Sequence, residues 1–107
     1  MASENEKPVR VLILALPEAS PAVLYGVHEV LASVGKVWTE LTGQAEPGRA
    51  VEVKIVGEKA GTIEAATGFP VVAECGLGDA GKCDIVIVPD LAISKDADPN
   101  GLWPAAR

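Results

Sequence analysis

Two short segments made almost entirely of apolar, mostly branched residues constrain the fold of this chain most strongly. Residues 9–16 read VRVLILAL, and residues 85–88 read IVIV. Strands buried on both faces of a parallel sheet show such continuous apolar runs, whereas strands with one wet face alternate apolar and polar residues. We therefore expect both segments to be strands in the interior of a parallel sheet, lying side by side.

The sequence that follows the first strand has the pattern of a single helix. Ser20 and Pro21 suit an N-cap and a first turn. Apolar residues then recur at helical spacing as far as Val34, and Gly35 suits the position that ends a helix. The pattern predicts one helix over residues 21–34.

The middle of the chain predicts shorter elements. Residues 51–57 alternate apolar and polar side chains, which is typical of a strand at a sheet edge, and we place it on the outer side of the first strand. Residues 62–66 and 69–72 are predicted to form a small hairpin, and residues 76–82 hold a short helical turn. Alternating strands and helices predict an α/β fold. We expect it to be flavodoxin-like, with three α/β/α layers around a mainly parallel sheet.

The predicted strands do not complete such a sheet. A buried IVIV strand needs a neighbour on each edge and cover on both faces, and the 107 residues hold no further strand to supply them. We therefore expect residues 1–8 to be a flexible leader and residues 9–107 to be the truncated, N-terminal half of a domain. The open strand edge predicts a homo-oligomer in which another chain covers Ile85, Val86, Ile87 and Val88.

Composition excludes several function classes. No apolar run approaches the roughly 20 residues of a membrane span, and the polar start is unlike a signal peptide, so we expect a cytoplasmic protein without membrane contact. A net charge of −6 without a Lys/Arg cluster argues against direct nucleic-acid contact from this chain.

Cys75, Cys83 and His28 lack the spacing of a zinc site, so we expect no metal and no cofactor. Two free thiols are favoured over a disulfide.

Three segments of the chain resemble the N-terminal half of the ThiJ/PfpI superfamily, which has the class I glutamine amidotransferase-like fold. They read VLILALPEASPAVLYGVHEVLASVGKVW, VEVKIVGEKAGTIEAATGFPVVAE and CDIVIVPDLAI. The most specific pieces are GVHEVL at residues 26–31, GFPV at 68–71 and DIVIVP at 84–89. The closest likeness is to the N-terminal domain of GlxA-type, AraC-family transcriptional regulators. The resemblance covers nearly all of residues 9–107.

The resemblance implies that these residues carry no catalytic site. Enzymes of the superfamily use a cysteine nucleophile on a strand-to-helix elbow, which lies beyond the end of this chain, and neither Cys75 nor Cys83 occupies it. The acid that bonds this nucleophile in the enzymes corresponds to Val23 here. The Gly-Gly that follows the strand's proline in some members is replaced by Asp90-Leu91.

The function implied by the resemblance is a non-catalytic ligand-sensing and dimerisation domain of an AraC-family regulator, whose DNA-binding module lies beyond this chain. The alternative is a superfamily enzyme, such as an amidase, an isonitrile-hydratase-like hydrolase or a glyoxalase/deglycase, whose nucleophilic cysteine also lies beyond it. An unknown small molecule is the expected effector. Doubly wound folds bind ligands at the carboxyl ends of their strands. Glu18, Ser20 and Asp90 follow strand ends and are therefore candidate ligand-binding residues. Two residues of the predicted helix are further candidates: Tyr25 through its hydroxyl, and Glu29 because the resemblance implies that the equivalent acid lines a ligand pocket.

Overall fold

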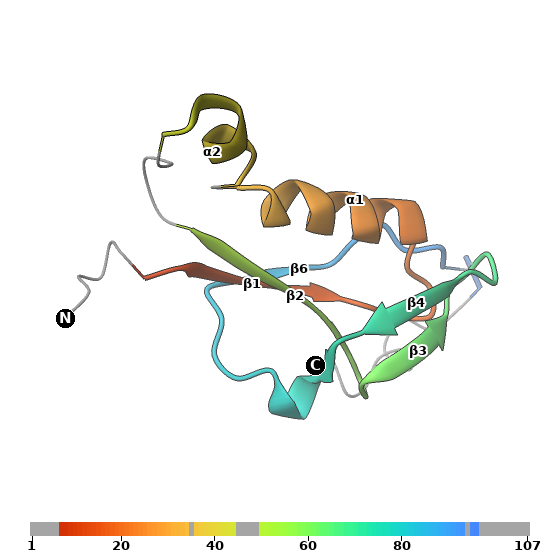
Figure 1. Cartoon of the computed structure of the whole chain (residues 1–107). Coiled ribbons are helices and arrows are strands. Elements are labelled where there is room, and N and C mark those ends of the chain that lie inside the picture. The colour runs from red at the N-terminus through yellow and green to blue at the C-terminus, as the bar shows by residue number, and fades with distance from the viewer. Residues whose placement is uncertain (1–6, 35, 45–49, 94, 97–107) are drawn as a thin grey trace.

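A four-stranded parallel sheet forms the centre of the computed structural model, which describes residues 7–34, 36–44, 50–93 and 95–96. The strand order is β5-β2-β1-β6 (Figure 1). The bounds are Val9–Leu14 for β1, Val51–Gly57 for β2, Cys75–Gly76 for β5 and Ile85–Ile87 for β6. β1 pairs in parallel with both β2 and β6, and β2 pairs in parallel with β5. The predicted α/β fold with a mainly parallel sheet is confirmed, and so is the adjacency of the first and last strands.

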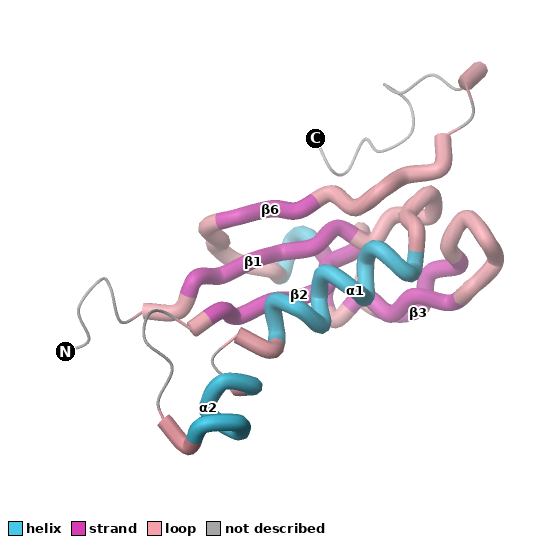
Figure 2. Tube along the Cα trace, turned by 90° about the horizontal axis from the view of Figure 1, so that it is seen from above, coloured by secondary structure: helices cyan, strands magenta, loops and turns pink. Residues whose placement is uncertain are grey.

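One helix covers one face of this sheet. α1 (Pro21–Ala32) connects β1 to β2 and lies over the β2 side, with β6 on the far side of β1 (Figure 2). It is two residues shorter than predicted. Ser33 is its C-cap residue, and both the N–H and the hydroxyl of Ser33 donate to the carbonyl of Glu29. Gly35, the predicted end, lies outside the described residues.

The remaining elements are short. β3 (Gly61–Glu64) and β4 (Pro70–Ala73) form the predicted antiparallel hairpin, and the predicted helical turn is a 3-10 helix, η2 (Leu77–Asp79). A second helix, α2 (Val37–Thr42), was not predicted and ends at Gly43, whose φ of 70° is left-handed. No helix in the described ranges has the length and apolar character to cross a membrane.

β1 is buried on both faces, as its sequence predicts. Ile13 is fully buried against Leu24 of α1 and Ile55 of β2. Leu12 belongs to a second cluster with Val56 and Ala80. Because successive residues of a strand point to opposite faces, Leu12 and Ile13 place apolar contacts on both sides of the sheet. α1 covers the Ile13 face, and the segment around η2 covers part of the other.

Within the described residues, the IVIV strand has the open edge that the sequence predicts. β6 lies at the end of the sheet, where Ile85 is 48% exposed, Val86 53% and Val88 54%. In the part of the chain that the structure describes, β6 is paired on its β1 side alone. A run of apolar residues indicates that a strand is stabilised by burial on both faces. Whether the strand is buried depends on its neighbours, which the run does not specify.

Residues 51–57 lie on the outer side of β1, as predicted, but their predicted edge position is wrong, because β2 lies between β1 and β5. β5 pairs only with Val56 and Gly57. Residues 51–55 therefore have a strand neighbour on the β1 side alone, within the part of the chain that the structure describes. The alternation of β2 reflects its two faces: Val53 and Ile55 pack in the cluster with Leu24 of α1, whereas Glu52 on the opposite face is exposed.

Candidate functional site

The loops that follow β1 and β6 meet at the carboxyl edge of the sheet. The N–H of Ser20 donates to the carbonyl of Asp90 at 2.9 Å, and the N–H of Ala92 donates to the carbonyl of Glu18 at 2.8 Å. Ala19 and Leu91 form an antiparallel bridge between them. Glu18, Ser20 and Asp90 are thus brought together at the edge where the topology predicts ligands to bind.

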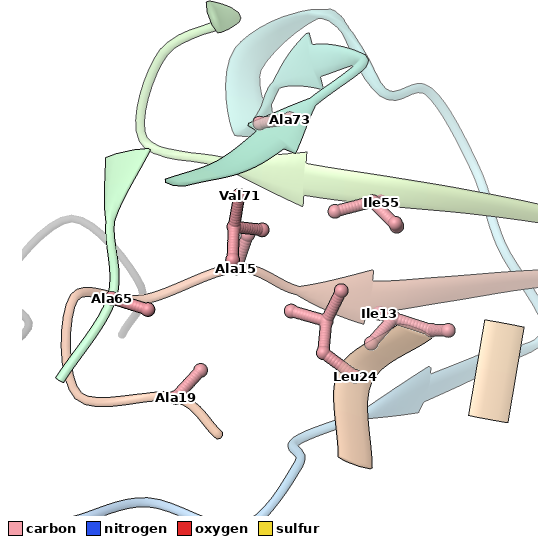
Figure 3. Close-up of a cluster of buried hydrophobic side chains, with 8 residues drawn as sticks. All are labelled: Ile13, Ala15, Ala19, Leu24, Ile55, Ala65, Val71 and Ala73. Carbon is pink, nitrogen blue, oxygen red and sulfur yellow. The ribbon is translucent and has the colours of Figure 1, made fainter. Parts of the chain in front are cut away.

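The hairpin β3–β4 packs against the same edge. Its Ala65, Val71 and Ala73 join Ala15 and Ala19 in the main buried cluster (Figure 3). Four of these five side chains are a single methyl group, so the two backbones can approach closely. The hairpin therefore stands beside the end of β1 and the start of α1, and residues of the hairpin line two pockets.

The first pocket lies between the end of β1 and the turn from β2 to β3. It has a volume of about 390 Å³ and is lined by Ala15, Leu16, Pro17, Glu58, Lys59, Ala60, Thr62 and Ile63. Its two charged residues, Glu58 and Lys59, were not among the predicted candidates. They directly follow β2, and that position at a strand's carboxyl end is the signal that could have found them.

The second pocket lies between the first turn of α1 and the tip of the hairpin. Its volume is about 460 Å³, and its lining residues are Ser20, Pro21, Ala22, Tyr25, Thr67 and Phe69. The Tyr25 hydroxyl accepts a hydrogen bond at 3.0 Å from the backbone N–H of Val72 in β4. Phe69 is 55% exposed. Both pockets fall within the size range of small-molecule sites.

The structure divides the five predicted ligand-binding residues. Ser20 and Tyr25 line the second pocket. Glu18 and Asp90 lie in the joined loops beside it, Glu18 half-buried and Asp90 exposed. Glu29 is exposed on α1, roughly 13 Å along the helix axis from Ser20, and the structure does not bring it to the others.

His28, Cys75 and Cys83 line neither of these two pockets. The described residues contain no group of three or more His, Cys, Asp or Glu side chains that could hold a metal ion. Cys75 and Cys83 are free, half-buried thiols that pack against the cluster of Leu12, Val56 and Ala80. Neither thiol lines either pocket. The pockets can therefore bind a molecule, but the described residues offer no cysteine nucleophile there.

Comparisons with known proteins show a likeness at the level of the fold. No family model matches the sequence, and no curated protein matches it. A crystal structure of an AraC family transcriptional regulator from Pseudomonas putida matches with a TM-score of 0.58 at 17% sequence identity, over 87% of this chain and 53% of that one. The chain thus spans about half the length of that structure. At this identity, the likeness shows that the chain shares its α/β fold with part of that regulator.

Proposed function

We propose that the chain is a non-catalytic, ligand-sensing domain of an AraC-type transcriptional regulator, and that it forms the N-terminal half of a ThiJ/PfpI-like domain. The observation that carries the proposal is the match to the Pseudomonas putida regulator over 87% of the chain. The sequence resemblance of GVHEVL, GFPV and DIVIVP supports the same family. A fold alone hosts many functions, so the site must support the proposal as well.

The second pocket provides that support. One wall belongs to α1 and the other to the hairpin, and the Tyr25–Val72 hydrogen bond connects the two. A small-molecule effector that binds better to one arrangement of these walls would shift the population toward that arrangement. DNA contact would come from another part of the protein, which agrees with the net charge of −6. A regulator of this type would act in the cytoplasm.

The enzymatic alternative has no comparable support in the described residues. It needs a thiolate held near a base or a dipole at the strand ends. Cys75 and Cys83 lie elsewhere, and Val23 is a 37% exposed apolar residue on α1. An enzyme would therefore need to take both nucleophile and acid from other residues.

Chromatin immunoprecipitation tests the regulatory function. An epitope-tagged copy of the protein, expressed from its own gene, is expected to enrich DNA at one or a few promoter regions. An untagged strain provides the background. Enrichment no higher than this background would contradict the proposal.

We also propose that two copies of the chain pair through β6. The exposed edge carries Ile85, Val86 and Val88, and β6 has no strand beyond it among the described residues. Antiparallel pairing of the two β6 strands about a twofold axis would join both sheets into one.

The charges beside β6 favour one register of this pairing over another. With Val86 opposite Val86, the exposed Lys82 of each copy lies opposite the exposed Asp90 of the other. A shift that centres on Ile87 instead places Asp84 opposite Asp90, which is repulsive.

Substitution Val86→Lys is expected to convert the dimer into a monomer, as measured by light scattering after size-exclusion chromatography. It places two lysines opposite each other at the centre of the proposed strand pair. Val72→Lys is the matched control, because Val72 is also 53% exposed but lies on the hairpin. A wild-type chain that is monomeric, or equal loss of dimer in both variants, would rule out pairing through β6.

A further inference from the structure

We infer that the second pocket is a site for a small, neutral aromatic compound that carries a hydroxyl group. The inference rests on the proposed function to the extent that such a compound would be the effector. Its physical basis is the pocket formed by Ser20, Pro21, Ala22, Tyr25, Thr67 and Phe69.

The aromatic preference follows from the two rings in the pocket. Phe69, the only phenylalanine of the chain, is 55% exposed at the hairpin, although burial of a phenylalanine side chain is strongly favourable. Tyr25 lines the same pocket from α1, and its hydroxyl is fixed by the N–H of Val72. The bond restrains the Tyr25 ring before any ligand arrives, so less entropy is lost on binding. A flat ring can stack against such side chains or meet them edge to face.

The neutral, hydroxylated character follows from the other lining residues. None of the six carries a charge, whereas the first pocket contains Glu58 and Lys59. A charged ligand would therefore lose hydration in the second pocket without gaining a side chain of opposite charge. Besides the Tyr25 hydroxyl, which accepts from Val72, the lining has the hydroxyls of Ser20 and Thr67, and that of Ser20 does not cap α1. Hydroxyls both donate and accept, so they suit the hydroxyl of a phenol.

Titration of the isotope-labelled chain with phenol, followed by amide NMR spectra, tests the site. We expect saturable shifts at Ser20, Ala22, Tyr25, Thr67 and Phe69. Phe69→Ala is expected to weaken binding about tenfold, because it removes the most exposed ring of the pocket. Val72→Ala is the matched control. It shortens another exposed hairpin side chain outside the pocket while keeping the N–H that binds Tyr25. The same spectra report whether each variant is folded.

Cyclohexanol separates stacking from simple ring burial. It has the ring size and hydroxyl of phenol but no π face, and we expect it to bind between about twofold and tenfold more weakly. Equal affinity for both compounds, shifts centred on Lys59 and Ile63, or unchanged phenol binding by Phe69→Ala would each overturn the inference. Absence of saturable shifts would also overturn it. Absence of phenol binding would not change the promoter enrichment measured in cells. The two experiments therefore distinguish failure of this inference from failure of the regulatory proposal.

Discussion

Replacing Leu24 by alanine is expected to lower the free energy of unfolding by about 2–5 kcal/mol. Leu24 is the one fully buried residue of α1 and packs in the main cluster with Ile13 and Ile55. Truncation removes its transfer free energy and leaves a cavity between helix and sheet. Since small domains have only about 5–15 kcal/mol of stability, this loss is a large fraction of the total. Chemical denaturation followed by circular dichroism measures it.

Leu41→Ala is the matched control for this prediction. The substitution is chemically the same, but Leu41 is 80% exposed on α2. We expect a change within about 0.5 kcal/mol, because surface substitutions away from special features have small effects. If the two variants lost stability equally, Leu24 would not be the residue that anchors α1 to the sheet.

Replacing Gly57 by alanine is expected to cost about 1–3 kcal/mol through overpacking. A Cβ atom at this position would lie 2.9 Å from Ile63 Cδ1, 3.0 Å from the Lys59 carbonyl oxygen and 3.1 Å from Ala73 Cβ. The Ile63 side chain can rotate away, but the Lys59 carbonyl belongs to the backbone of the turn from β2 to β3. The turn must therefore shift, and the first pocket, which Lys59 and Ile63 line, shifts with it.

Gly26→Ala provides a control of opposite sign. Gly26 lies within α1, and a Cβ atom there meets nothing within 4 Å. Alanine is favoured over glycine in a helix by about 1 kcal/mol, so this variant should be more stable than the wild type. Thermal denaturation of both variants measures the contrast. A Gly57→Ala protein as stable as wild type would contradict the close packing at the β2–β3 turn.

Much of the fold could be predicted from apolar patterning alone. The run in residues 9–16 identified the central strand, because a strand with apolar residues at successive positions must be covered on both faces. The hairpin followed from turn residues, and Gly68 indeed has a φ of 84°. Such signals are local, since they reside within a few neighbouring residues.

The errors concern features that depend on distant parts of the chain. The position of β2 between two strands is set by β5, a strand of two residues with no sequence pattern of its own. The helix α2 is six residues long, too short for a helical period to stand out. None of these features has a local signal strong enough to predict.

In the candidate site, too, local sequence patterns predicted some features, whereas contacts between distant residues could not be predicted. Ser20 was predicted from its place after the first strand, and it lines a pocket. Tyr25 was predicted to contact a ligand through its hydroxyl. In the structure that hydroxyl accepts a hydrogen bond from the N–H of Val72, and Tyr25 lines the second pocket. This hydrogen bond joins residues that are far apart in the sequence, so no pattern around Tyr25 could reveal it.

The position of β1 has a consequence for how the protein is made. β1 leaves the ribosome before β2 and β6, yet it lies between them in the sheet. Its register couples Val11 to Val53 on one edge and to Ile85 on the other. Such long-range pairing slows folding, because the intervening chain must close as a loop first. During translation β1, whose residues are apolar except for Arg10, thus keeps an open edge until Ile87 has been added, and such a species is prone to aggregation.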